Sequence, residues 1–339
     1  MTPGQQGSLA ERRSASLAEL VGAPGRRVLV IGASKDPNPK VTVVLFEGDK
    51  EPVRAIKVPL TEVAAASVMT ERRVLTEIAG AIGDTPVAGT IPRVLGDAVF
   101  EGRTALVCSP VRGVPMGSIY HRWRHTSRPR AVRSDFSAAA KWLEGFQAVT
   151  RAEDAPVTLG AGVGQAIRAR FGDVPAASRV ESLAATFAGV RAPRTAVHGD
   201  FWFGNLFVDR ASVSGVVDWE GGAVRGDPLR DLVRFPLAYA LYLERHTLPS
   251  HRVRGHRGLF AAWGEGVVFA LHGDGWFSAL VRDFIGGGLR RLGLPDSLWR
   301  DAALLGVAEM AITADHPGFA ERHMALFERV AGVAGVAGR

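Results

Sequence analysis

The segments AVHGDFWFGNLFVD (residues 196–209) and GVVDWEGG (residues 215–222) restrict the fold of this chain more than any other part of it. Both begin with apolar, strand-like residues that run into a polar group. The polar residues are His198, Asp200, Asn205 and Asp218. Burying such groups costs free energy unless they are hydrogen-bonded or bind a ligand. The pattern therefore predicts two buried strands that carry a binding or catalytic site at their ends.

The order of these polar residues favours phosphoryl-transfer chemistry. We expect Asn205 before one strand and Asp218 after the next, so that the two side chains lie side by side. An amide oxygen and a carboxylate suit Mg²⁺, because this ion prefers hard oxygen ligands, keeps several waters and uses few protein ligands. Asp200 is then placed to accept a proton from an attacking hydroxyl group.

The motifs HGDFWFGN, DWE and GDPLRDL together resemble the aminoglycoside phosphotransferase / choline-kinase-like superfamily, a branch of the protein-kinase-like fold. The family pattern H-G-D-x4-N, followed by D-[FW]-E, is matched with Asn205 five positions and Asp218 eighteen positions after Asp200. The resemblance implies that Asp200 is the catalytic base and that Asn205 and Asp218 hold Mg²⁺. It also implies that His198 supports the loop backbone.

Two further acidic residues of these motifs have open roles. Glu220 is either a second metal contact or a partner in a structural hydrogen bond. Asp227 precedes Pro228, and an Asp-Pro pair is typical of a helix start. The family resemblance adds a second interpretation, in which Asp227 also ties down the catalytic loop.

The distribution of strand-like and helical patterns predicts three parts. A polar N-terminal extension covers residues 1–25. Residues 26–108 are expected to form a small, mostly antiparallel sheet lobe with one helix at 62–82. Residues 109–339 are expected to form a larger, mainly helical lobe in which only the region 196–218 is strand-like. The expected fold is therefore α+β and protein-kinase-like, with two lobes and a ligand in the cleft between them.

Apolar spacing typical of helices recurs along the larger lobe. The expected helices cover residues 134–150, 162–190, 228–246, 258–272, 276–292, 296–313 and 317–334. No apolar run approaches the length of about 18 residues that a membrane span requires. With a single cysteine, Cys108, and no apolar leader at the N-terminus, the sequence predicts a cytoplasmic protein that does not act at a membrane.

The net charge of +7 comes from arginine, since only five of the 41 basic residues are lysine. An arginine bias of this kind is typical of a GC-rich genome. A nucleic-acid-binding protein would be expected to have a basic stripe with interleaved aromatic residues or a known binding module. The chain shows no such module, so nucleic acid is not an expected partner.

The resemblance requires a phosphate-binding lysine and an acidic partner in the sheet lobe. Lys57 lies in RAIKVPL on the third expected strand, in a context similar to the A-I-K strand of kinases. Alone it would be an ordinary surface lysine, whereas in this context it is expected to contact the α and β phosphates of a nucleotide. The segment SVMTERRVLTEIAG offers Glu71 and Glu77 as partners, and the family pattern R-E-x-x-x-L-x-x-L favours Glu71.

The segment TALVCSPVRGVPMG resembles the hinge of the family, where adenine bonds to main-chain groups. We expect the carbonyl of Ser109 and the amide of Val111 to bind the base, because Pro110 has no N–H. The chain has neither G-x-G-x-x-G between its first strands nor a P-loop motif. The expected cofactors are ATP, with GTP as an alternative donor, and Mg²⁺.

The acceptor is expected to be a small molecule with a hydroxyl group, such as a sugar, a metabolite or an antibiotic. From residue 228 to the C-terminus there are 11 acidic and 13 basic residues, with no acidic cluster for a polycationic aminoglycoside. Two basic segments, at 121–133 and 250–258, either attract an anionic acceptor or are solvated loops.

Together these features predict an ATP- and Mg²⁺-dependent phosphotransferase with an alcohol group as acceptor, that is, a small-molecule kinase. The alternative is a catalytically weak, kinase-like nucleotide-binding or regulatory protein, which would lack a catalytic residue, and none is missing here. A protein kinase is disfavoured, because HGD replaces H-R-D, DWE replaces D-F-G and no A-P-E segment occurs. No feature of the sequence indicates an oligomeric state.

Overall fold

The structure is a computed structural model that describes residues 15–22, 24–31, 39–48 and 51–336. Its internal contacts group the chain into two units: the first is Met1–Arg72 with Val94–Pro110, and the second is Arg73–Arg93 with Val111–Arg339. The boundary falls within α2 (Glu62–Ile82), a helix that the sequence predicted with these bounds.

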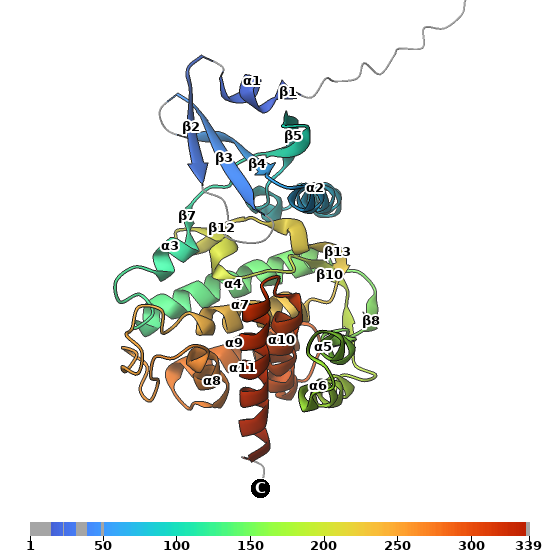
Figure 1. Ribbon diagram of the computed structural model, residues 1–339, viewed down its shortest axis with the longest axis vertical. Helices are drawn as coiled ribbons and strands as arrows, with labels where there is room; N and C mark the ends of the chain where they lie inside the picture. The colour runs from blue at the N-terminus through green and yellow to red at the C-terminus, as the bar shows by residue number, and fades with distance from the viewer. Residues whose placement is uncertain (1–14, 23, 32–38, 49–50, 337–339) are drawn as a thin grey trace, which may run out of the picture. The chain divides into compact units, whose positions relative to one another are not determined.

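A sheet forms most of the first unit (Figure 1). Its strand order is β1-β5-β6-β4-β3-β2, and neighbouring strands are antiparallel except β1 and β5, which are parallel. The strands are β1 (Ala15–Ser16), β2 (Arg26–Ile31), β3 (Lys40–Glu47), β4 (Pro52–Pro59), β5 (Val94–Phe100) and β6 (Arg103–Cys108). Strands β2 to β6 occupy the runs rich in apolar and β-branched residues that predicted them.

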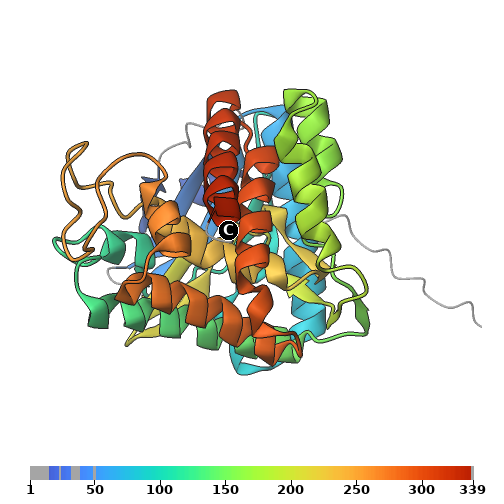
Figure 2. The ribbon, with the colours of Figure 1, turned by 90° about the horizontal axis from the view of Figure 1, so that it is seen from below.

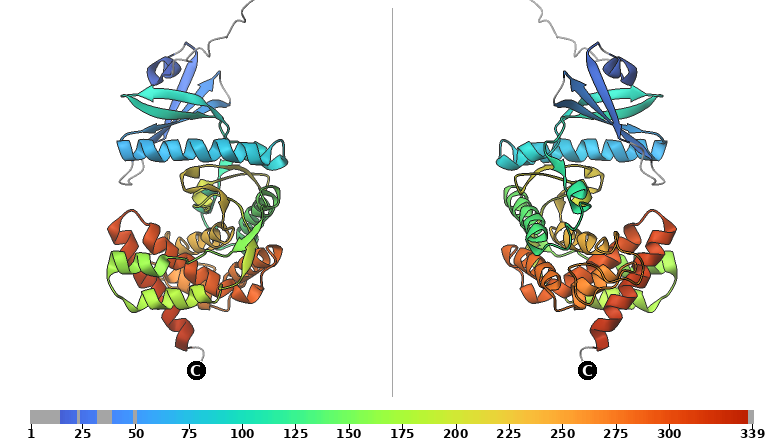
Figure 3. Two further views of the ribbon diagram at one scale, coloured as in Figure 1. Left: turned by 90° about the vertical axis from the view of Figure 1, so that its right-hand side faces the viewer. Right: turned by 90° about the vertical axis from the view of Figure 1, so that its left-hand side faces the viewer.

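One face of this sheet carries the apolar core of the first unit. Alternate side chains of the central strands point to this face, because the side-chain period of a strand is two. The core residues are Val43, Leu45, Ile56, Val58, Ala98, Ala105 and Val107. Leu17 and Leu20 of the short helix α1 (Leu17–Val21) pack against this cluster, and Figure 3 shows the strands and α1 from two opposite sides. The central strands are therefore buried, and β4 carries Lys57.

The second unit is mainly helical. Its helices are α3 (Met116–Tyr120), α4 (Pro129–Val149), α5 (Val163–Phe171), α6 (Pro175–Ala185), α7 (Leu229–Leu241), α8 (Glu265–His272), α9 (Trp276–Arg291), α10 (Trp299–Thr313) and α11 (Pro317–Val336). Figure 2 shows these helices from below. Aromatic side chains join α4, α7 and α9, with the ring of Phe136 centred 5.2 Å from Phe235 and 5.4 Å from Phe284.

Short strands of the second unit form small sheets around the segment singled out by the sequence. A three-stranded antiparallel sheet has the order β12-β11-β7, and two further pairs are β10–β13 and β8–β9. The strands are β7 (Val114–Pro115), β8 (Asp154–Pro156), β9 (Arg191–Pro193), β10 (Thr195–Val197), β11 (Leu206–Asp209), β12 (Ser212–Val216) and β13 (Ala223–Gly226). The predicted strands on both sides of the H-G-D motif are thus present. The expectation that only the region 196–218 is strand-like in this lobe is wrong, because β7, β8, β9 and β13 lie outside it; with two to four residues each, they are too short to show a clear alternation.

Several predicted helix limits are wrong for identifiable reasons. The helix expected over 162–190 is two helices, because Gly172, with φ of 83°, ends α5 and Pro175 starts α6. The helix expected over 258–272 begins only at Glu265, after Gly264 with φ of 81°. The helix α3 was not predicted, since its five residues are too few to show a period.

The expected fold class is confirmed: a small, mostly antiparallel sheet unit precedes a larger, mainly helical unit. No helix among the described residues combines the length and the apolar character needed to cross a bilayer.

Candidate active site

Asp200 lies in the loop of residues 198–205 that leads from β10 to β11. Its Oδ1 accepts a hydrogen bond from Nε of Arg234 at 2.9 Å, and Nη2 of the same guanidinium lies 2.7 Å from Oδ1. Its Oδ2 accepts a hydrogen bond from Nδ2 of Asn205 at 3.2 Å. The Asp200 side chain is nevertheless 38 % exposed. An ionised carboxylate offers about four lone-pair positions, so Asp200 can also accept a hydrogen bond from a ligand hydroxyl.

His198 is buried and holds the 198–205 loop against β12. Its Nδ1 accepts the N–H of Asp200 at 3.2 Å, so the ring proton is on Nε2, which donates to the carbonyl of Val217 at 2.9 Å. The ring thus connects the backbone of the candidate base with the backbone just before Asp218. This contact pattern agrees with a supporting role for His198.

Asp231, which the sequence analysis did not single out, fixes the same loop from α7. Its Oδ2 accepts the N–H of His198 at 2.6 Å and its Oδ1 accepts the N–H of Gly199 at 2.9 Å. Burial raises the pKa of Asp231, while His198 and the two N–H donors counteract part of that rise. The motif GDPLRDLVR contained a signal for it, because Asp227, Asp231 and Arg234 recur at helical spacing.

Gly199 of this loop packs tightly against the backbone of Gly221. Its φ is +81°, and a Cβ at this position would lie 2.0 Å from the carbonyl oxygen of Gly221. A side chain is therefore excluded both by backbone conformation and by space. This contact brings the H-G-D turn directly against the D-W-E-G-G turn.

Asn205 and Asp218 lie at the facing ends of β11 and β12. The carbonyl of Asn205 accepts the N–H of Val217 at 3.0 Å, and Asp218 is the next residue. Nδ2 of Asn205 donates to the backbone carbonyl and to Oδ2 of Asp200, so its amide oxygen is the part of the side chain left to bind a cation. Asp218 has φ of 73° and ψ of 63°, a left-handed conformation that costs about 1–3 kcal/mol in a residue other than glycine. One amide oxygen and one carboxylate at adjoining strand ends fit the donor set that Mg²⁺ takes.

The other two acidic candidates occupy different places. Glu220 lies half-buried in the turn η3 (Trp219–Gly221). Asp227 is buried at the start of α7, where Oδ1 accepts the N–H of Leu229 at 3.0 Å. Its Oδ2 accepts the N–H groups of Thr158 at 2.6 Å and Leu159 at 3.0 Å. Asp227 thus binds the helix start and the 158–159 backbone, whereas Asp231 binds the 198–205 loop.

An aromatic cluster supports this loop from the core side. Phe201 stacks on Trp142 with ring centres 5.2 Å apart, and His198 lies 4.6 Å from Trp219. Trp219 is buried, and its Nε1 donates to the carbonyl of Val216 at 2.8 Å. Large aromatic rings in close contact have few alternative packings. The polar residues above them are therefore held in one arrangement.

In the first unit, Lys57 of β4 forms an ion pair with Glu71 of α2. Nζ lies 2.8 Å from Oε1 and 2.6 Å from Oε2, and Glu71 is buried. Glu77 instead contacts Arg73 one helical turn away, with Nη1 3.0 Å from Oε2, on the exposed side of α2. The structure therefore pairs Lys57 with the residue that the sequence favoured over Glu77.

The predicted hinge residues lie at the end of the sheet and just beyond it. Cys108, the last residue of β6, is buried, and burial is the main cause that raises its pKa to about 12. At neutral pH it is a protonated thiol of low reactivity. Ser109 is half-buried, and Val111 packs on Gly215 of β12, where a Cβ would lie 2.5 Å from Cβ of Val111.

The two basic segments predicted from the sequence lie side by side. Nε2 of His256 is 2.9 Å from the carbonyl oxygen of Thr126, and a Cβ on Gly255 would lie 2.7 Å from Cα of Ser127. Figure 2 shows the orange loop that precedes α8 beside the turn that precedes α4. At one end of these segments, the ring of His121 lies 6.2 Å from Phe203 of the 198–205 loop.

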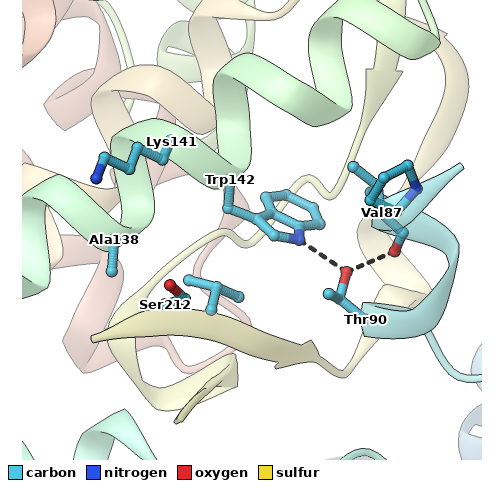
Figure 4. Close-up of a pocket in the computed structure, with 8 residues that line it drawn as sticks. Val87, Thr90, Ala138, Lys141, Trp142 and Ser212 are labelled. Atoms are coloured by element: carbon cyan, nitrogen blue, oxygen red, sulfur yellow. Dashed lines mark hydrogen bonds between the residues drawn. The ribbon is translucent and has the colours of Figure 1, made fainter. Parts of the chain in front are cut away.

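A pocket of about 210 Å³ lies elsewhere in the second unit (Figure 4). Trp142 forms part of the pocket wall, and its Nε1 donates a hydrogen bond to Oγ1 of Thr90 at 2.8 Å. The lining residues are Pro86, Val87, Thr90, Ala138, Lys141, Trp142, Ser212 and Val213. None of the predicted site residues is among them, so this pocket is not the candidate active site.

Comparison with known proteins tests the family resemblance. A family model described as the phosphotransferase enzyme family matches residues 41–266. This range contains the H-G-D and D-W-E motifs as well as Lys57, and the match confirms the resemblance inferred from those motifs. No curated protein matches the chain.

Solved structures share the fold at low sequence identity. A thermostable mutant of aminoglycoside phosphotransferase APH(4)-Ia, in a ternary complex with ADP and hygromycin B, has a TM-score of 0.57 and 13% identity, and covers 93% of this chain and 96% of that one. The macrolide 2'-phosphotransferase MphH from Brachybacterium faecium has a TM-score of 0.52 and 15% identity over 92% and 98% of the two chains. The streptomycin–ATP complex of APH(2")-IIa has a TM-score of 0.51 and 13% identity over 92% and 94%. The kinase-like architecture expected from the sequence is therefore confirmed.

Proposed function

This chain belongs to the phosphotransferase enzyme family, and from that premise we propose that it moves the γ-phosphate of ATP to a hydroxyl group of a small molecule, with Mg²⁺ as cofactor. In this reaction the bond between the γ-phosphorus and the bridging oxygen of ADP breaks. A new bond forms between phosphorus and the acceptor oxygen, and the hydroxyl proton goes to Asp200. The products are ADP and a phosphate monoester.

The observation that carries this proposal is the state of Asp200. Its carboxylate is partly exposed, yet it is oriented by Asn205 and Arg234, and its backbone is held by His198. A positioned carboxylate of this kind can orient the acceptor hydroxyl and accept its proton without reorganisation during the reaction.

The other candidate residues would bind different parts of the metal–nucleotide complex. The amide oxygen of Asn205 and the carboxylate of Asp218 would hold the metal, since the Asn205 carbonyl accepts the N–H of Val217, the residue before Asp218. When bound, Mg²⁺ neutralises charge on the β- and γ-phosphate oxygens. Lys57, kept in place by the buried Glu71, would contact the α and β phosphates, and the backbone of Ser109 and Val111 would contact the base.

The test is ADP release in the presence of Mg²⁺ and ATP with a library of hydroxylated compounds, followed by mass spectrometry of the products. We expect phosphorylated products, and a loss of about 10²–10⁴-fold in turnover for Asp200→Asn. Asp209→Asn is the matched control, since Asp209 is an exposed aspartate at the end of β11. Equal turnover of the Asp200→Asn variant and the wild type would contradict the role of Asp200. Nucleotide binding without any transfer would favour the regulatory alternative.

A further inference from the structure

Arg234, on α7, is a cation in direct contact with the candidate base. Its Nε and Nη2 both approach the same oxygen, Oδ1 of Asp200, at 2.9 Å and 2.7 Å. A guanidinium has five N–H donors in a planar fork. Its Nη1 has no hydrogen-bond partner in the described part of the chain, and the side chain is 29 % exposed. Arg234 can therefore bind a ligand while it remains beside Asp200.

Aromatic rings connect the 198–205 loop to a second arginine. Trp202 stacks on Tyr242 with ring centres 5.8 Å apart, and the guanidinium of Arg245 lies 5.4 Å from the Tyr242 ring. Arg245 is exposed. The side chain of the neighbouring Glu244 points toward α8, since its Oε2 would lie 3.3 Å from a Cβ on Gly266. Trp202 of the loop is thus linked through Tyr242 to an exposed cation.

We propose that the acceptor carries an anionic group, a carboxylate or a phosphate, that binds to Arg234 next to the hydroxyl that is phosphorylated. The inference rests on the proposed function, because the acceptor hydroxyl must reach Asp200 to lose its proton. A substituent that points from that hydroxyl toward Oδ1 of Asp200 then lies close to the guanidinium. An anion at Nη1 gains charge-assisted hydrogen bonds, whereas an ammonium group has no acceptor to offer these N–H donors.

The competing explanation is that Arg234 only orients Asp200. In that case its replacement changes turnover of every acceptor to the same extent, whatever the charge of the acceptor. The assignment to acceptor binding instead predicts a charge-dependent effect, which appears in KM of the acceptor as well as in kcat. Charge preference therefore separates the two roles.

The experiment compares matched acceptors that differ in charge: glucose, glucuronate, glucose 6-phosphate and glucosamine, together with a library of hydroxylated carboxylates and phosphate esters and their uncharged counterparts. Acceptor-dependent ADP release is measured for the wild type, Arg234→Gln and Arg234→Lys. Arg230→Gln is the matched control, because Arg230 lies one turn earlier on α7 and faces Glu309, with Nε 3.6 Å from Oε2. Circular dichroism and thermal unfolding establish that each variant is folded.

We expect anionic compounds to be phosphorylated with higher kcat/KM than their neutral or cationic counterparts. Arg234→Gln should lower kcat/KM for anionic acceptors by roughly 10- to 100-fold and for neutral ones by less. Arg234→Lys should retain part of the preference for anionic acceptors, and Arg230→Gln should retain all of this preference. If Arg234→Gln does not fold, the test uses the Arg234→Lys variant alone, and its kcat/KM for anionic and neutral acceptors is compared with that of the wild type.

Three results would overturn the inference: no anionic compound is phosphorylated, neutral or cationic compounds are preferred, or the Arg234 variants keep the wild-type preference. The proposed function is tested by a separate measurement, the release of ADP when ATP is hydrolysed without an acceptor. We expect this hydrolysis to depend on Asp200. An active enzyme that phosphorylates only neutral or cationic compounds would leave the proposed function intact. Absence of transfer together with hydrolysis that is unchanged in Asp200→Asn would defeat the proposed function itself.

Discussion

Asp231 accepts the backbone N–H of His198 at 2.6 Å, and through this bond a buried carboxylate on α7 determines where the H-G-D turn lies. The same carboxylate accepts the N–H of Gly199. Because α7 also carries Arg234, which contacts Asp200, one helix positions both the backbone and the side chain of the candidate base.

Replacing Asp231 by Asn is expected to loosen this turn. The amide has one acceptor oxygen for two N–H groups, so one buried donor loses its partner, at a cost of about 1–3 kcal/mol in stability. We expect kcat to fall by roughly 10- to 100-fold with little change in KM for the nucleotide, because the variant misplaces Asp200 but leaves the nucleotide contacts in place. Steady-state kinetics and thermal unfolding measure both effects. The control is Asp283→Asn, an aspartate with a 71% exposed side chain on α9. A purely structural role would lower stability without changing kcat of the folded enzyme.

The pair of Lys57 and Glu71 is expected to determine nucleotide affinity. Lys57→Ala should raise the dissociation constant for Mg²⁺-ATP by about tenfold or more, which corresponds to about 1.4 kcal/mol. Glu71→Gln should act in the same direction but more weakly, since it removes the charge that holds the ammonium group. Glu77→Gln is the matched control on the same helix, because Glu77 contacts the exposed Arg73. Calorimetric titration gives the three affinities. Unchanged affinity in Lys57→Ala would refute the phosphate contact.

The metal role of Asn205 and Asp218 can be separated from nucleotide binding in general. Asp218→Ala and Asn205→Ala should weaken ATP binding in magnesium by roughly tenfold or more, because each removes an oxygen ligand. In the presence of a chelator, the affinity for ATP should be the same in both variants and the wild type. Titrations with and without magnesium provide the comparison. A variant that binds ATP as tightly as the wild type under both conditions would remove that residue from the metal site.

Glu244 is expected to make the stability of the protein depend on pH. Burial is the main cause that raises its pKa from 4.5 to about 7, and its Oε2 has no hydrogen-bond partner among the described residues. The folded state therefore favours the protonated acid. Its stabilising contribution is complete below pH 4.5 and is lost as the pH rises through about 7.

Glu244→Gln should abolish this dependence, because a glutamine has no proton to lose. Between pH 5 and pH 8 the melting temperature of the wild type should fall by roughly 2–4 °C more than that of the variant. Differential scanning calorimetry at both pH values measures the difference. Parallel curves for the two proteins would show that Glu244 titrates normally.

The local order of the chain was sufficient to predict strands β2 to β6 and β10 to β12, most helices and the polar residues that gather around Asp200. Strand and helix periods depend on neighbouring residues. Asp200 and Asn205 lie in one loop between two short strands, and Asp218 follows the next strand. The sequence also favoured Glu71 over Glu77 as the partner of Lys57, because the family pattern R-E-x-x-x-L-x-x-L aligns with Glu71. Errors arose where a glycine and a proline divide one apolar pattern, as they do at Gly172 and Pro175.

The tertiary structure decided which groups hold and surround the base. Asp231 and Arg234 are more than thirty positions from Asp200 in sequence, and their contacts depend on how α7 packs against the aromatic residues beneath the loop. Pattern analysis detects which residues share a face of a helix, but it does not specify the element that this face meets. That choice is made by long-range packing, which assigns Asp231 to the loop backbone and Arg234 to the carboxylate of Asp200.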